Sequence, residues 1–367
     1  MSSNTIYPCP YKTYPPSAYW SKSVAARPFA EIDPVSPPPF LITPQMRIAT
    51  AGSCFAQHIA RYLSESGYNY FVTENIAQGL IPAEIVRHYN YRVFPARFAN
   101  IYTSRQLLQL HQRAYGDFQP QEDVWEEAGV LLDPFRPHIQ PGGFETLEIF
   151  QRDRAQHFAA VRRMFEQTNV FVFTLGLTEA WRHKSDGAVY PVCPGCGAGA
   201  FDPGKYEFHN FDYAEIITDL RQVISRMIKK NPGIRFIFTV SPVPLVATAT
   251  GNHVLAATTY SKSVLRAVAG KLAAEHPRVA YFPSYEIITN PANCGAYFGS
   301  DRRTVTEEGV RAVMKLFFRH FTASPEEKTA KAPPASPLHE RLPSAEQAAA
   351  GIACEEEMLE AQAARLD

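Results

Sequence analysis

Apolar and polar residues follow one another along the chain in two alternating kinds of segment. Short apolar runs rich in β-branched and aromatic residues predict strands that are buried on both faces. Between them, apolar residues recur at helical spacing, which predicts amphipathic helices. Strands are predicted at 47–50, 68–72, 170–175, 236–240 and 279–282, and helices at 54–66, 103–115, 153–167, 213–230, 258–275 and, after an N-cap at Thr306, up to 321.

This alternation predicts an α/β fold in which helices cover both faces of a mostly parallel sheet. Right-handed crossovers bring the carboxyl ends of all the strands to one edge of the sheet, which we call the carboxyl rim. Ligands of open α/β sheets bind along this edge. The candidate functional residues are therefore those that directly follow a predicted strand.

The pattern also divides the chain into segments. Residues 46–322 are predicted to form one α/β domain, with Gly/Pro/Asp-rich insertions near 116–150 and 183–212 that shape a pocket at the carboxyl rim. Residues 1–45 are rich in proline and lack periodicity, so we expect an extended N-terminal arm. Residues 323–367 are rich in Ala, Glu and Pro and bury too little apolar surface to offset chain entropy, so a disordered tail is predicted.

Composition narrows the classes of partner. The 367 residues include 36 Lys and Arg against 36 Asp and Glu, and this balance argues against a nucleic-acid or anionic-membrane partner. No run of about 18 apolar residues predicts a membrane helix, and no signal peptide is recognisable. Six cysteines are too few for a disulfide scaffold, so we expect a cytoplasmic protein. Nothing in the sequence indicates a cofactor or an oligomeric state.

Ser53 is the first candidate for chemistry. It lies at the predicted turn between the first strand and its helix, where unpaired N–H groups and the positive end of the helix dipole favour a developing oxyanion. The alternative is that Ser53 only caps the helix, as serine commonly does. Cys54 is a second possible nucleophile, although we expect it to face the core.

Other polar residues follow later strands and reach the same edge. The candidates for a general base are His253, which we favour, and His183; Glu286 and Asp301 are the carboxylates placed to orient such a histidine. Each of these residues has an ordinary alternative role, as a solvated side chain, a loop hydrogen-bond partner or an arginine partner. Thr178 and Glu179 follow the strand at 170–175.

Cys193 and Cys196 form a Cys-x-x-Cys pair in a Gly-rich loop. Such a pair is half of a structural zinc site, but four ligands are needed and no second pair has matching spacing. We therefore predict two loop cysteines and no metal.

Gly52-Ser53-Cys54-Phe55-Ala56 is the pentapeptide for which the GSCFA family is named, a branch of the SGNH/GDSL-like hydrolases. The sequence resembles that family over about 45–322. This resemblance implies a three-layer α/β/α sandwich with Ser53 as the nucleophile. Further blocks that resemble the family, in the family's order, lie at 100–103, 133–137, 174–181, 239–244, 260–263 and 282–286.

The resemblance also implies an oxyanion site. The Ser53 N–H is one donor, and the family's glycine falls at Gly79 or in the Asn100 region. The superfamily's asparagine aligns with Thr178, whose hydroxyl can donate one hydrogen bond. The Asp-x-x-His motif of the superfamily aligns with residues 301–304, so Thr304 replaces the histidine. Loss of one member of a catalytic triad costs roughly 10⁴–10⁶-fold in turnover in other enzymes.

We therefore expect a serine esterase or O-acyltransferase that acts on an acylated small molecule or carbohydrate through an acyl-enzyme on Ser53, with His253 as base. The alternative is a catalytically degenerate SGNH-like binding protein, which the threonine at 304 favours. A third reading is an interaction scaffold that uses the C-terminal tail.

Overall fold

Four parallel strands form the central sheet of the computed structural model, which describes residues 9–76 and 81–323. Gly52 lies opposite Thr174, and Thr174 lies opposite Thr239, so the strand ends are aligned at the carboxyl rim. The strands, in their order across the sheet, are β1 (Ile48–Gly52), β4 (Val170–Leu175), β8 (Arg235–Val240) and β9 (Val279–Tyr281).

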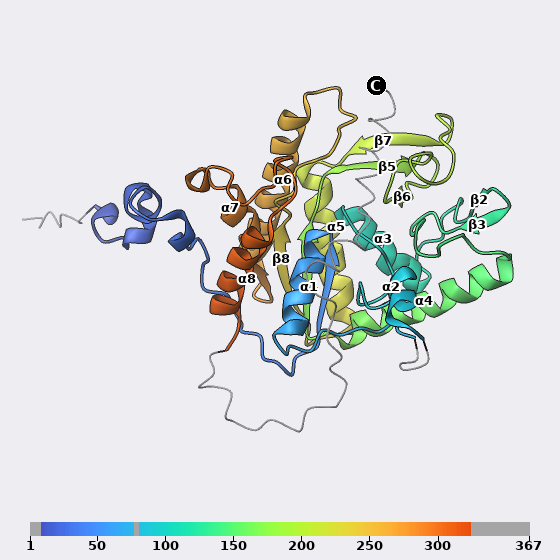
Figure 1. Ribbon diagram of the computed structural model, residues 1–367, viewed down its shortest axis with the longest axis horizontal. Coiled ribbons are helices and arrows are strands. Elements are labelled where there is room, and N and C mark those ends of the chain that lie inside the picture. The colour runs from blue at the N-terminus through green and yellow to red at the C-terminus, as the bar shows by residue number, and fades with distance from the viewer. Residues whose placement is uncertain (1–8, 77–80, 324–367) are drawn as a thin grey trace, which may run out of the picture.

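Helices cover both faces of this sheet, with α7 and α8 on one side and α3 and α5 on the other (Figure 1). The predicted α/β fold is therefore confirmed as a three-layer α/β/α arrangement. One layer contains α1 (Phe55–Glu65), α7 (Ser284–Thr289) and α8 (Glu307–Phe321), and the other contains α3 (Ser104–Tyr115), α4 (Leu147–Gln167), α5 (Tyr213–Lys230) and α6 (Val254–Glu275).

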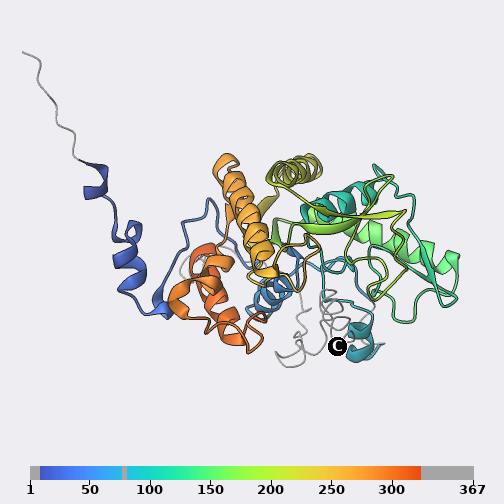
Figure 2. The same cartoon turned by 90° about the horizontal axis from the view of Figure 1, so that it is seen from above.

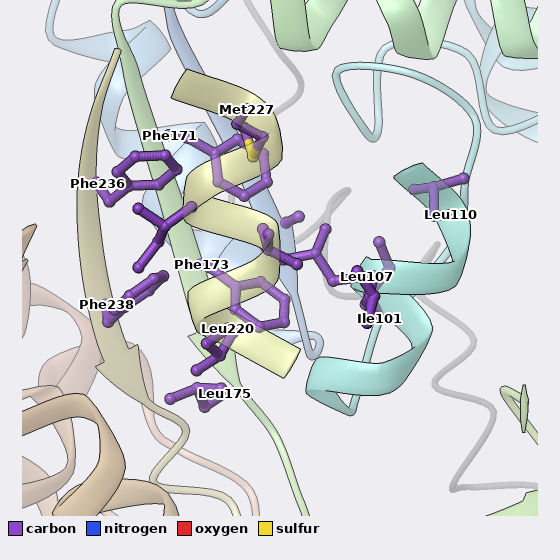
Figure 3. Packing of buried hydrophobic residues seen from close by; sticks show 14 of the residues in the cluster. Ile101, Leu107, Leu110, Phe171, Phe173, Leu175, Leu220, Met227, Phe236 and Phe238 are labelled. Atoms are coloured by element: carbon purple, nitrogen blue, oxygen red, sulfur yellow. The ribbon is translucent and has the colours of Figure 1, made fainter. Parts of the chain in front are cut away.

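The central strands are apolar because both of their faces are covered. All six residues of β4 are buried. Phe171 and Phe173 project from β4 toward Leu220 and Met227 of α5, while Val170 and Val172 pack against the opposite helical layer (Figure 3). This two-sided packing explains why the run at 170–175 reads as uniformly hydrophobic.

The predicted strand at 68–72 is wrong. Only Tyr70 forms a bridge, beside Ile48 of β1. Two residues later the chain turns away, because Thr73 N and Glu74 N donate hydrogen bonds to the carbonyl of Pro95 rather than to β1. A long-range partner therefore ends the pairing that local β propensity favours.

Helix boundaries agree with the sequence where a capping residue is present. The predicted cap at Thr306 is confirmed, since its Oγ1 accepts a hydrogen bond from Gly309 N. Two predicted starts are too late: α4 begins six residues before 153, after an N-cap at Thr146, and α6 begins at Val254. The cap of α6 is His253, and this affects the candidate site described below.

Both predicted insertions contain strands that the sequence did not predict. Segment 116–150 contains the hairpin of β2 (Trp125–Glu127) and β3 (Val130–Leu132). Segment 183–212 adds β6 (Val189–Tyr190) and β7 (Tyr206–Asn210) to β5 (Glu179–His183), which gives an antiparallel sheet of order β6-β5-β7. The short helix α2 (Ala83–His88) lies in the connection between α1 and α3.

The N-terminal arm leads away from the body of the molecule (Figure 2). It is less extended than expected, because it forms short helical turns over η1 (Pro10–Lys12), η2 (Pro16–Ala18), η3 (Ser21–Ala25) and η4 (Phe29–Glu31). Asp33 attaches the arm to α8 by accepting hydrogen bonds from Arg319 and His320. The predicted tail falls, apart from Ala323, outside the described residues. Among the helices that are described, none has the length and apolar character needed to cross a membrane.

Candidate active site

The turn between β1 and α1 depends on a glycine. Gly52 has φ 136°, a region that L-residues with a side chain rarely adopt. A Cβ at this position would lie 2.8 Å from the Cβ of Thr174 and still closer to its carbonyl oxygen. Only glycine can therefore let the chain leave β1 this close to β4 and deliver Ser53 to the start of the helix.

Ser53 occupies this turn with its side chain enclosed. It is 4% exposed, and its Oγ has no hydrogen-bond partner in the part of the chain that the structure describes. The N-cap position of α1 is Cys54, half-buried, whose side chain makes no capping hydrogen bond. The alternative role of Ser53 as a helix cap is therefore not seen: its carbonyl accepts a hydrogen bond from Ala56 N, but its hydroxyl caps nothing.

The Ser53 N–H does not fit the oxyanion role that the resemblance implies. It points at the carbonyl of Thr174, 3.3 Å away, and so extends the β1–β4 ladder by one bond. A backbone donor committed to the sheet is a poor donor for an oxyanion.

Asn100 lies beside the turn. The next residue, Ile101, donates its N–H to the carbonyl of Gly52 at 2.9 Å, which places segment 100–102 over the end of β1. Asn100 is 3% exposed, and its Oδ1 accepts a hydrogen bond from Gln57 of α1 at 3.1 Å. Asn100 therefore lies next to the residue that binds Gly52, the neighbour of Ser53 in the chain. Gly79, the other candidate, lies outside the described residues.

Thr178 is fully engaged. Its N–H donates to Ser261 Oγ at 3.0 Å, its hydroxyl donates to Asn210 Oδ1 at 2.6 Å, and its carbonyl accepts from Phe211 N. It thus holds the turn after β4 rather than offering a donor to a ligand. Glu179 has a similar role, because its carboxylate accepts hydrogen bonds from Thr248 Oγ1 and Ala249 N in the loop after β8.

Neither predicted histidine contacts Ser53. His253 is exposed, and its Nδ1 caps α6 by accepting a hydrogen bond from Leu255 N at 3.2 Å. His183 ends β5, where its Nδ1 lies 2.8 Å from Ser185 Oγ and 3.6 Å from Asp186 Oδ1. The Nδ1 atom of each histidine is thus engaged by neighbours close to it in the chain.

The two carboxylates are likewise held by other groups. Glu286 accepts hydrogen bonds from Arg266 Nε and, at 2.7 Å, from Tyr281 OH. Asp301 closes a tight turn by accepting hydrogen bonds from the N–H groups of Arg303 and Thr304, and from Thr304 Oγ1 at 2.5 Å. The hydroxyl of Thr304 holds the pKa of Asp301 below its ordinary value. Threonine at 304 therefore has a defined partner, Asp301.

Lys262 is the residue at this edge that the sequence analysis missed. It is 2% exposed, and its Nζ donates a hydrogen bond to the carbonyl of Gly176 at 2.6 Å. The neighbouring Ser261 binds Thr178 N in the same turn. Helical periodicity could have identified this lysine in the sequence, because Lys262 occupies the buried face of α6 together with Leu265 and Ala269. A lysine on an apolar helix face is seldom buried without a specific role.

A buried network of ionic groups contacts segment 96–102 and holds it in place. Arg97 is 1% exposed and donates hydrogen bonds to the carbonyls of Tyr89 and Ile139 and to Asp153. The backbone N–H of Arg97 donates a hydrogen bond to Glu74 Oε2, and the same oxygen lies 2.6 Å from His157 Nδ1. Although burial alone raises the pKa of Glu74, His157 and neighbouring arginines lower it to about 2. The polar groups that surround this backbone fix the position of Asn100.

Two cavities lie near these elements. A small one of about 30 Å³ is lined in part by Asn100, Arg136 and His157. A larger surface cleft of about 540 Å³ lies between α3 and α5, and the two insertions contribute Phe118 and Asp186 to its lining. Ser53 lines neither.

Comparison with known proteins identifies the family to which this chain belongs. Residues 47–317, well over half of the chain, match the GSCFA family. The chain belongs to the GSCFA family. No match was found among the curated proteins compared with it.

In this GSCFA protein, the Cys-x-x-Cys loop has few possible metal ligands around it. Within residues 9–76 and 81–323, no group of three or more His, Cys, Asp or Glu side chains is arranged to hold a metal ion. Cys193 and Cys196 are free thiols, and burial, reinforced by Cys196, raises the pKa of Cys193 to about 12. A thiol with so high a pKa is a weak nucleophile at neutral pH.

Proposed function

We propose that this GSCFA protein is a serine esterase or O-acyltransferase that acts on an acylated small molecule or carbohydrate. The observation that carries the proposal is the Ser53 hydroxyl. It is buried, has no partner among the described residues, and lies before the N-terminus of an 11-residue helix on a turn that requires glycine. A buried hydroxyl left unpaired costs stability, and such costs are typical of functional sites.

In the proposed reaction, Ser53 Oγ attacks the carbonyl carbon of an ester. The Oγ–C bond forms, the hydroxyl proton passes to a base, and the departing alcohol takes a proton as its C–O bond breaks. Water or a sugar hydroxyl then receives the acyl group from Ser53. Asn100 is the side chain best placed to donate to the oxyanion, because segment 100–102 is bound to Gly52.

His253 remains our candidate for the base. It lies in the loop after β8, on the same edge of the sheet as Ser53, and a change in that loop is needed to bring the imidazole to the hydroxyl. Contacts between catalytic groups are often completed only when substrate binds. A carbohydrate substrate is supported by Trp181 and the 47% exposed Phe201, whose rings pack edge to face beside the rim and offer apolar surface to a sugar ring.

Fluorophosphonate labelling followed by peptide mapping tests the proposal. The wild-type protein is expected to be labelled on the peptide that contains Ser53, and Ser53→Ala is expected to abolish both this label and hydrolysis of p-nitrophenyl acetate. Ser66→Ala, at the opposite end of the same helix, is the matched control and should retain both. Equal labelling of wild type and Ser53→Ala would refute Ser53 as the nucleophile.

The Asp301–Thr304 turn favours a second candidate function, that of a catalytically degenerate protein that binds an acylated sugar. In that case the wild type would bind acetylated glycosides but would not be labelled by a fluorophosphonate. Calorimetric titration with an acetylated and a deacetylated glycoside distinguishes the two functions.

A further inference from the structure

The carboxyl rim beside Ser53 contains a buried cation that the proposed reaction does not yet use. Lys262 is 2% exposed and reaches the rim from α6, on the other side of β4 from the Ser53 turn. A buried ammonium group loses its hydration, so its position is stabilised only by specific interactions. The bond from Lys262 Nζ to the Gly176 carbonyl is such an interaction.

One short backbone segment links the lysine to the serine. Ile101 N binds the carbonyl of Gly52, and the carbonyl of Tyr102 accepts hydrogen bonds from the N–H groups of Gly176 and Leu177. Gly52 and Thr174 are also direct neighbours across β1 and β4. Neighbouring strands lie about 4.8 Å apart and a strand advances about 3.3 Å per residue, so we estimate about 10 Å between Ser53 and the ammonium bound to the Gly176 carbonyl, two residues after Thr174.

We infer that Lys262 is a positioning residue of this site: it holds the turn at 176–178 in place and supplies positive charge at the edge where the oxyanion on Ser53 develops. This inference rests on the proposed function. Lys262 acts with Ser261, which fixes the same turn through Thr178 N but carries no charge. At about 10 Å and an effective dielectric constant of about 20, a unit charge changes the rate of oxyanion formation by about tenfold.

The rate at which a fluorophosphonate labels Ser53 depends on this charge and can be measured without a complete catalytic cycle. Ser53 Oγ attacks phosphorus, the P–F bond breaks, and fluoride and the hydroxyl proton are released. The phosphonate oxygen takes the place of the ester oxyanion. The second-order labelling rate is measured against pH for the wild type, Lys262→Met, Lys262→Arg and Ser261→Ala, with urea unfolding of each variant to verify folding.

The expected result is a roughly tenfold slower reaction in Lys262→Met, a rate restored by Lys262→Arg, and a smaller, pH-independent loss in Ser261→Ala. A folded Lys262→Met labelled as fast as wild type would overturn the inference.

If Lys262→Met does not fold, Lys262→Gln decides, because its amide can donate a hydrogen bond to the Gly176 carbonyl but carries no charge. A folded Lys262→Gln that is labelled as fast as the wild type excludes the charge role. Absence of any label on Ser53 in the wild type is a different result, because it refutes the proposed function itself rather than the role of Lys262.

Discussion

His111 allows a sharp test of how burial controls the stability of this protein. The side chain lies in α3, is 2% exposed, and stacks on Tyr115 with ring centroids 4.6 Å apart. Neither ring nitrogen has a hydrogen-bond partner in the part of the chain that the structure describes. Burial lowers the pKa of His111 from 6.5 to about 4. The folded protein therefore keeps this imidazole neutral at a pH where the unfolded chain protonates it.

The sign and size of the effect follow from this difference. Because the folded pKa is depressed, the contribution to stability is complete above pH 6.5 and is lost as the pH falls toward 4. The interval of 6.5 − 4 = 2.5 pH units, at about 1.36 kcal/mol per unit, corresponds to about 3 kcal/mol. Replacement by leucine, which cannot titrate, removes this loss.

We expect His111→Leu to be as stable as the wild type at pH 7.5, or slightly more stable, because it also removes two buried polar atoms without partners. At pH 4 the variant should be more stable than the wild type by about 3 kcal/mol. Urea unfolding followed by circular dichroism at several pH values measures this difference. His276→Gln, at the C-cap of α6, is the control for loss of a histidine. Parallel stability curves for His111→Leu and wild type would refute the reasoning.

Four further substitutions test other parts of the structure. Gly52→Ala should destabilise the protein by several kcal/mol, because its Cβ overlaps Thr174, and a thermal melt close to that of the wild type would contradict this. Arg97→Met removes a buried guanidinium beside Glu74 and Asp153, although His157 and Arg136 remain as their partners, and should cost about 3 kcal/mol in urea unfolding. A cost under about 1 kcal/mol would show that the network does not hold segment 96–102. Thr306→Ala removes the cap of α8 and should cost about 1 kcal/mol in the same assay, whereas no change would mean that solvent satisfies Gly309 N equally well. Thr304→His places an imidazole beside Asp301 and should raise p-nitrophenyl acetate hydrolysis at least about tenfold, provided that Ser53 is present. If the same increase is seen in the Ser53→Ala background, the new histidine does not act together with Asp301 and Ser53 as a catalytic triad.

The layers of the fold could be predicted because their signals are local. The run at 170–175 is apolar throughout because both faces of β4 are covered, and Thr306 marks the start of α8 through its own side chain. The strand predicted at 68–72 failed because pairing beyond Tyr70 depends on the carbonyl of Pro95, a partner that β propensity does not encode. The strands of the insertions were missed for different reasons: β2 and β3, like β6, are only two or three residues long, and β7 pairs with β5 across a long loop.

Prediction of the candidate site from the sequence is limited in the same way. Sequence position placed His253 at the correct edge but could not reveal that its Nδ1 caps α6. Thr178 aligned with a donor, yet its hydroxyl already donates a hydrogen bond to Asn210 Oδ1. Lys262 was detectable in principle from its place on an apolar helix face. What no sequence pattern provides is the distance between groups on different strands, and these distances decide which groups can react with one another.

The contacts of segment 101–102 suggest how this site can tolerate sequence change. Ile101 and Tyr102 join the ends of β1 and β4 through main-chain hydrogen bonds, while their buried side chains are constrained by packing. The hairpin of β2 and β3 and the sheet of β5 to β7 lie outside this connection. Exposed residues in those segments, other than Glu179 and Asn210, can therefore diversify and alter what the protein recognises while the turn after β4 is kept.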